Sequence, residues 1–176
     1  MGWILLAALA ALVVWGISLY NRLVALRNGG ESAWSDIDVQ LKRRWELIPN
    51  LVETVKGYAK HEQSTFEKVT AARTPGEHAA AEASLQGTLK SLFAVAEAYP
   101  ELRANENFLG LQRDLSGLEE AIQNARRYYN AVVRDLNTAI ESFPGNLLAG
   151  PFGFTKREYF ELDSEAERSA PKVSFS

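Results

Sequence analysis

The chain offers few residues for acid-base or metal chemistry. Its 176 residues include two histidines and no cysteine, which excludes disulfides, thiolate metal sites and a cysteine nucleophile. His61 and Glu62 begin like the H-E-x-x-H motif of zinc proteases, but Thr65 stands where the second ligand must follow. Neither histidine has a Glu three residues before it, as inward-facing Glu-x-x-His metal pairs require. We therefore expect no catalytic residue, no metal site and no cofactor.

Charged groups supply the remaining candidate binding features. Lys42, Arg43 and Arg44 form a basic band that could contact anionic lipid headgroups or a partner protein. An ordinary solvent-exposed helix face is the alternative interpretation. Glu119 and Glu120 flank an apolar stripe, and we expect them to be solvated or paired with basic side chains. With 19 basic and 22 acidic residues the net charge is −3, so we expect no nucleic-acid partner.

The apolar pattern predicts the helices that must carry these groups. Apolar residues recur every three or four positions over about residues 31–73, which indicates a long helix that buries one face. Gly29 and Gly30 predict a break before it. Pro49 removes one backbone hydrogen bond inside it, so we expect a helix kink there, with a full break as the alternative.

Two more helices are expected, over about residues 75–99 and 106–143. The second has the most regular repeat, with apolar residues at alternating steps of three and four, as in bundles and coiled coils. Asn105 is expected to cap its start, and residues 143–146 (FPGN) to end it. Amide side chains near the apolar stripes are expected to fix helix register and partner choice rather than to form a ligand pocket. Among them are Asn130 and Asn137.

The first twenty residues predict a membrane anchor. Residues 3–21 carry no charge and are just long enough, as a helix, to cross the roughly 30 Å hydrocarbon layer of a bilayer. A cleaved signal peptide is the alternative, because residues 8–10 (ALA) resemble a cleavage site. No Lys or Arg precedes the apolar run, however, which favours a retained anchor. The anchor residues include Trp3, Leu5, Leu12, Trp15 and Tyr20.

The basic residues after this span, Arg22 and Arg27, predict by the positive-inside rule that the rest of the chain lies in the cytoplasm. We expect three regions: an anchor over residues 1–28, a helical bundle over 31–146 and a partly ordered tail over 147–176. The tail is rich in aromatic side chains that could dock on the bundle, meet a partner or touch the membrane. Phe152 and Phe154 are the candidate lipid or partner contacts.

Several segments resemble the LemA family. They include AWSDIDVQLKRR at residues 33–44, LIPNLVETVKGY at 47–58, ANENF at 104–108, ARRYYN at 125–130 and FPGN at 143–146. The resemblance implies a single-pass bacterial membrane protein with a bundle of long helices. It also implies a poorly defined molecular function, so it transfers no catalytic residue to this chain.

The expected fold is therefore all-α, with an N-terminal transmembrane helix followed by an antiparallel bundle of long helices. The two outer helices of that bundle are much longer than the middle one, so part of their apolar stripes needs other cover. We expect a homo-oligomer in the bacterial inner membrane that acts without catalysis as a scaffold or adaptor. The alternative is an accessory subunit that positions a membrane enzyme, such as a protease, or a transporter; a membrane protein would then be its partner.

Overall fold

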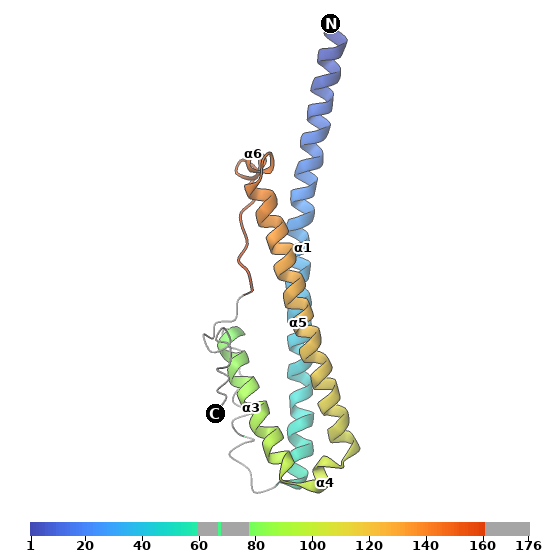
Figure 1. Cartoon of the computed structure of the whole chain (residues 1–176), viewed down its shortest axis with the longest axis vertical. Coiled ribbons are helices and arrows are strands. Elements are labelled where there is room, and N and C mark those ends of the chain that lie inside the picture. The colour runs from blue at the N-terminus through green and yellow to red at the C-terminus, as the bar shows by residue number, and fades with distance from the viewer. Residues whose placement is uncertain (60–66, 68–77, 161–176) are drawn as a thin grey trace, which may run out of the picture. The chain divides into compact units, whose positions relative to one another are not determined.

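The computed structural model describes residues 1–59, 67 and 78–160. In these residues the chain forms helices and no strand, as Figure 1 shows, which confirms the all-α fold. The helices described are α1 (Gly2–Tyr58), α3 (His78–Glu97), α4 (Pro100–Arg103), α5 (Glu106–Glu141) and α6 (Gly145–Ala149). The chain divides into two compact units. Unit 1 joins residues 1–39 to 122–160, and the described residues of unit 2 lie within 40–121.

Unit 2 is built around an apolar core to which α1, α3, α4 and α5 all contribute. Within it α1 and α5 run antiparallel, because Arg44 pairs with Glu119 and, fourteen residues on, Tyr58 pairs with Asn105. The Asn105 side chain also accepts a hydrogen bond from the Phe108 amide at 3.0 Å, which confirms the predicted cap of α5. The core residues are Ile48, Leu51, Val52, Val55, Ala59, Leu85, Leu89, Leu92, Ala96, Leu102, Phe108 and Leu115.

In unit 1 the helices α1 and α5 pack closely where the sequence predicted a break. The predicted break at Gly29 and Gly30 is wrong, because α1 continues through both residues. A Cβ atom on Gly29 would lie 3.5 Å from a methyl group of Val132, and one on Gly30 would lie 3.0 Å from the Arg157 guanidinium. These glycines therefore admit the close approach of α5 and of a later segment, instead of interrupting the helix.

The far end of α1 also differs from the prediction. Pro49 lies inside α1, so the helix continues through it and the alternative of a full break is wrong; the kink itself stays a prediction. The helix ends at Tyr58 instead of near residue 73, one residue after Gly57, a residue type that disfavours helix. Most of the remaining predicted stretch, including His61, lies outside the described residues.

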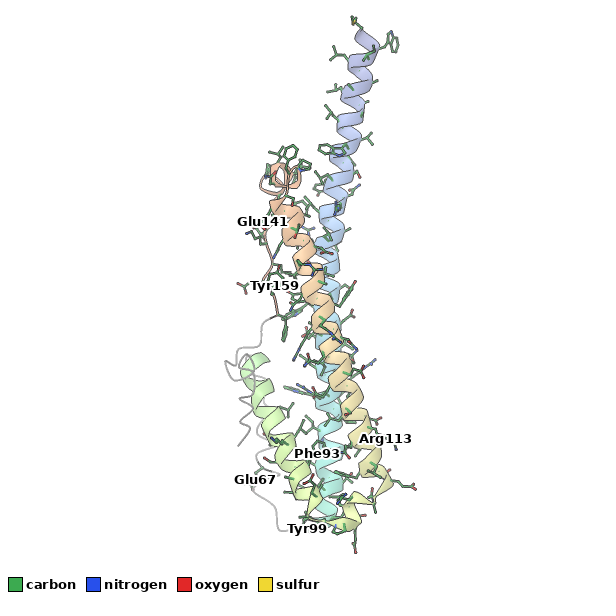
Figure 2. The ribbon with its side chains drawn as sticks, viewed as in Figure 1. Glu67, Phe93, Tyr99, Arg113, Glu141 and Tyr159 are labelled. Carbon is green, nitrogen blue, oxygen red and sulfur yellow. The ribbon has the colours of Figure 1, made fainter. Side chains whose placement is uncertain are left out.

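After α5 the chain turns and forms the short helix α6, which the sequence pattern did not predict. Gly145 is required at this turn, because a Cβ atom there would lie 1.9 Å from the carbonyl oxygen of Ala139. Residues 154–160 then run without helix beside α5 in unit 1 (Figure 1). An ion pair between Lys156 and Glu141, whose side chain is labelled in Figure 2, ties this segment to the end of α5.

Candidate interaction sites

Two asparagines of α5 hold the backbone of the extended segment. Asn130 donates its amide to the carbonyl of Phe160 at 3.0 Å and accepts the Phe160 backbone N–H at 2.8 Å. Asn137 makes the same pair of bonds with Arg157, both at 2.9 Å. Each side chain thus satisfies the donor and the acceptor of one residue, as a neighbouring β-strand would. We call these four residues the asparagine clamp.

The spacing of the clamp matches helix geometry to strand geometry. Asn130 and Asn137 are seven residues apart on a helix, which is about 10 Å. Arg157 and Phe160 are three residues apart in extended chain, which is also about 10 Å. Both bonded pairs can therefore form together, and the extended segment runs antiparallel to α5. The sequence placed these amides near the apolar stripe correctly, but their partner is a loop backbone and not another helix.

Aromatic side chains close around the clamp in unit 1. The Trp34 ring lies 5.2 Å from the Tyr129 ring and 5.9 Å from the Phe160 ring, measured between centroids. The buried Arg126 guanidinium lies 4.6 Å from the Phe160 ring centroid, a cation-π contact. The Tyr129 hydroxyl donates to the Glu158 carbonyl at 2.9 Å. These contacts partly bury the clamp's hydrogen bonds, and partial burial strengthens them.

The Tyr129 hydroxyl gives this site a measurable pH dependence. Burial raises the pKa of Tyr129 above its ordinary value, and the nearby Arg157 charge lowers it by a smaller amount. A raised folded-state pKa contributes stability that is present below the ordinary value and is lost as pH rises through the folded value. We therefore expect Tyr129→Phe to lower the unfolding free energy by about 1 kcal/mol at neutral pH. The difference in unfolding free energy between the variant and the wild type should disappear above about pH 10.

Urea unfolding of both proteins in detergent at a series of pH values checks this expectation. A gap that stays constant from neutral pH to strongly alkaline pH would contradict the assigned role of the hydroxyl. Spectrophotometric titration supplies the control, because subtracting the variant's curve isolates Tyr129. Its ionisation should move to lower pH when the chain is unfolded.

The basic band of residues 42–44 does not act as one surface. Lys42 and Arg43 are exposed, whereas Arg44 is 1% exposed inside unit 2. The Arg44 Nη1 atom donates to Glu119 Oε1 at 2.9 Å, which confirms Glu119 as a salt-bridge partner. Arg44 therefore joins α1 to α5, and the predicted lipid or partner contact can rest only on Lys42 and Arg43.

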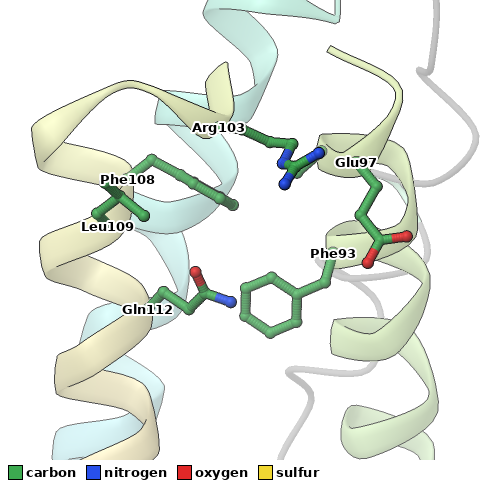
Figure 3. A pocket seen from close by; sticks show the side chains of 7 residues that line it. Phe93, Glu97, Arg103, Phe108, Leu109 and Gln112 are labelled. Atoms are coloured by element: carbon green, nitrogen blue, oxygen red, sulfur yellow. The ribbon is translucent and has the colours of Figure 1, made fainter. Parts of the chain in front are cut away.

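A cavity of about 540 Å³ opens between α3, α4 and α5 in unit 2. Figure 3 shows the Phe93 ring and the Gln112 amide facing each other across it, with Arg103 and Glu97 at the other end. Its lining combines an aromatic pair, Phe93 and Phe108 at 6.2 Å, with charges from α3 and α4. It presents no nucleophile beside a base. No group of three or more potential metal-ligating side chains occurs in the described part of the chain.

The N-terminal part of α1 presents its apolar side chains outward. None of its most apolar stretch is buried, and the helix is long and apolar enough to cross a membrane. The five predicted anchor residues, Trp3, Leu5, Leu12, Trp15 and Tyr20, are all exposed. A soluble protein would bury such a stretch.

Where this apolar stretch ends, aromatic residues of unit 1 gather around Tyr20. Its ring lies 5.1 Å from Phe152 and 5.6 Å from Phe154, both edge to face. Phe154 is buried beside Leu23, and the Arg27 guanidinium lies 5.4 Å from its ring centroid. Phe152 remains exposed, so it is the member of the predicted pair that is free to meet a lipid or a partner.

The family model described as "LemA family" matches residues 33–175, which is most of the chain. This chain belongs to the LemA family. The match includes the residues that form the core of unit 2 and the asparagine clamp of unit 1. The resemblance noted in the sequence is thereby confirmed.

Curated relatives of this LemA-family chain carry two kinds of name. Magnetosome proteins MamQ 1 and MamQ 2 of Paramagnetospirillum magneticum are each 26% identical to it over 175 residues. That alignment covers 81% of this chain but 64% of each relative, so the chain spans less than two thirds of their length. Protein LemA of Metamycoplasma hominis is 28% identical over 159 residues, covering 84% of this chain and 71% of the relative. None of these names is that of an enzyme.

Proposed function

We propose that this LemA-family chain is a non-enzymatic, membrane-anchored helical adaptor that self-assembles in the bacterial inner membrane. The outward-facing apolar stretch of α1 carries the proposal, because its exposed side chains need lipid around them. The polar groups of the bundle support the non-enzymatic part. Arg44 and Glu119 join two helices, and Asn130 and Asn137 hold a loop, so these groups serve the chain's own structure.

In this proposal residues 1–28 anchor the chain and 31–146 form the bundle, and the first part of the predicted tail, residues 147–160, is held in unit 1 by the asparagine clamp. The anchor and the bundle share the helix α1. Arg22 and Arg27, just after the span, favour a single pass with the bundle in the cytoplasm.

Unequal helix lengths support self-assembly. The α3 helix has 20 residues and belongs to unit 2, whereas α5 has 36 residues and α1 continues for 30 residues (29–58) beyond the anchor. In the described part of unit 1, α1 and α5 pack on each other and on residues 145–160 alone. Val39, Tyr128 and Tyr159 are exposed there. A second copy would cover such side chains in a homo-oligomer.

Photo-crosslinking in intact membranes tests the proposal. A photoreactive amino acid replaces Tyr128, which is exposed in unit 1, and in a control chain it replaces the exposed Asp114. We expect a crosslinked product of twice the chain mass from position 128 only. A crosslink to a different membrane protein instead would favour the accessory-subunit alternative. The same products, or none, from both positions would contradict self-assembly through unit 1.

A further inference from the structure

An apolar segment follows α5 and has no role in the bundle core of unit 2. Between Glu141 and Lys156 the chain contains no charged residue over fourteen positions. Three of its large apolar side chains point to solvent: Phe143 is 78% exposed, Leu147 63% and Phe152 57%. Three such side chains within ten residues form an exposed apolar surface of a kind that usually marks a contact. We call residues 143–154 the apolar loop.

The apolar loop packs against the membrane-spanning part of α1. Phe152 meets Tyr20 edge to face at 5.1 Å, and α6 lies beside this part of α1 in Figure 1. A cleft of about 370 Å³ separates the two segments. Its lining is almost entirely apolar and consists of Val13, Gly16, Ile17 and Tyr20 from α1 with Leu148 and Phe152 from the loop.

The cleft reaches into the apolar span. Val13 precedes Tyr20 by seven residues, which is about 10 Å along a helix. If Tyr20 lies at the membrane surface, as an aromatic residue at the end of a span does, Val13 lies within the hydrocarbon layer. A loop that shares a cleft with Val13 must then meet the same layer.

In α1 and in the apolar loop, the change from apolar to charged residues occurs at the same depth relative to the predicted membrane surface. On α1 the first charged residue after the span is Arg22, and Arg27 contacts Phe154 at the end of the apolar loop. On the loop side the charges return at Lys156. The two apolar segments thus end together, as expected for segments that enter the same leaflet.

We propose that the apolar loop is a second membrane contact of this chain. It lies in the leaflet where the span ends, with Phe143, Leu147 and Phe152 among the lipids and an acyl chain in the cleft. The occupant is bilayer lipid because the cleft is continuous with the span and its lining offers almost no polar group. This inference rests on the proposed anchoring of residues 1–28.

Fluorescence quenching tests the second contact. The chain has no native cysteine, so Leu147→Cys in the full-length protein carries a single polarity-sensitive fluorophore at an exposed position. Leu9→Cys reports on the span, and Ser35→Cys reports on an exposed bundle position of unit 1. Each protein is reconstituted in vesicles of phosphatidylcholine and phosphatidylglycerol. The quenchers are lipids that carry a spin label partway along the acyl chain, and aqueous iodide.

We expect spin-labelled lipid to reduce the emission at positions 147 and 9 by about half or more, and iodide to quench only position 35. Strong iodide quenching at position 147 would overturn the second contact, because the loop would then face water. Protection of position 147 from both quenchers would also overturn it, in favour of cover by a second copy. If position 9 escapes lipid quenching, the anchoring itself is wrong and the proposed function fails with it.

Discussion

Replacing Arg44 by alanine should lower the unfolding free energy by about 3 kcal/mol. This is a large effect for a residue that the sequence pattern assigns to the surface. Two costs combine. The substitution leaves a void where a fully enclosed side chain stood, and it removes the 2.9 Å charge-assisted hydrogen bond to Glu119. The Glu119 side chain is 32% exposed, so water can solvate it once its partner has gone. That solvation keeps the loss below the largest values known for broken buried pairs.

Arg43→Ala is the matched control, because it removes the same residue type one position away from an exposed site. It should change stability by less than about 0.5 kcal/mol. Urea unfolding of the intact protein in detergent, followed by circular dichroism, measures both variants. Equal effects of the two substitutions would contradict the assignment of Arg44 to the interior of unit 2.

Replacing both clamp asparagines by alanine should free the extended segment while leaving the helices folded. Four hydrogen bonds are lost, but the backbone groups of Arg157 and Phe160 can then bond to water. We therefore expect a local cost of about 3 kcal/mol instead of the full sum. Hydrogen exchange at the backbone amides of these two residues should become about 100-fold faster.

Asn124→Ala is the control, because Asn124 is an exposed asparagine on the same helix and does not bond to the segment. It should leave both exchange rates unchanged. Unchanged rates in the Asn130→Ala/Asn137→Ala variant would contradict the clamp. The contacts of Phe160 with Trp34 and Arg126 would then be what holds the segment.

The features of this fold that could be predicted are those whose cause is local in sequence. Apolar residues at helical spacing predicted the helices that became α1, α3 and α5. The cap at Asn105 and the stop at residues 143–146 were also predictable, because a capping side chain and a proline act on their own neighbours. The exposed anchor residues follow in the same way from an uninterrupted run of uncharged positions.

The features that could not be predicted depend on residues far away along the chain. From the local sequence, Gly29 and Gly30 predict a break in the helix. In the structure they lie where Val132 and Arg157 approach α1. Arg44 looks like part of a surface band, because its partner Glu119 lies 75 positions on. The sequence pattern predicts that Asn130 pairs with another helix. Its actual partner is the backbone of Phe160, which is 30 positions away and which no sequence motif marks. In each case the tertiary contact, not the local pattern, decides the role.

We propose that this LemA-family chain works as a membrane-anchored assembly. The most direct test is the mass of the intact protein, extracted with a native-membrane polymer and measured at micromolar concentration. The proposal predicts a particle whose protein mass is an integer multiple, two or more, of the 19.5 kDa chain. A particle that contains one copy at every concentration tested would contradict self-assembly.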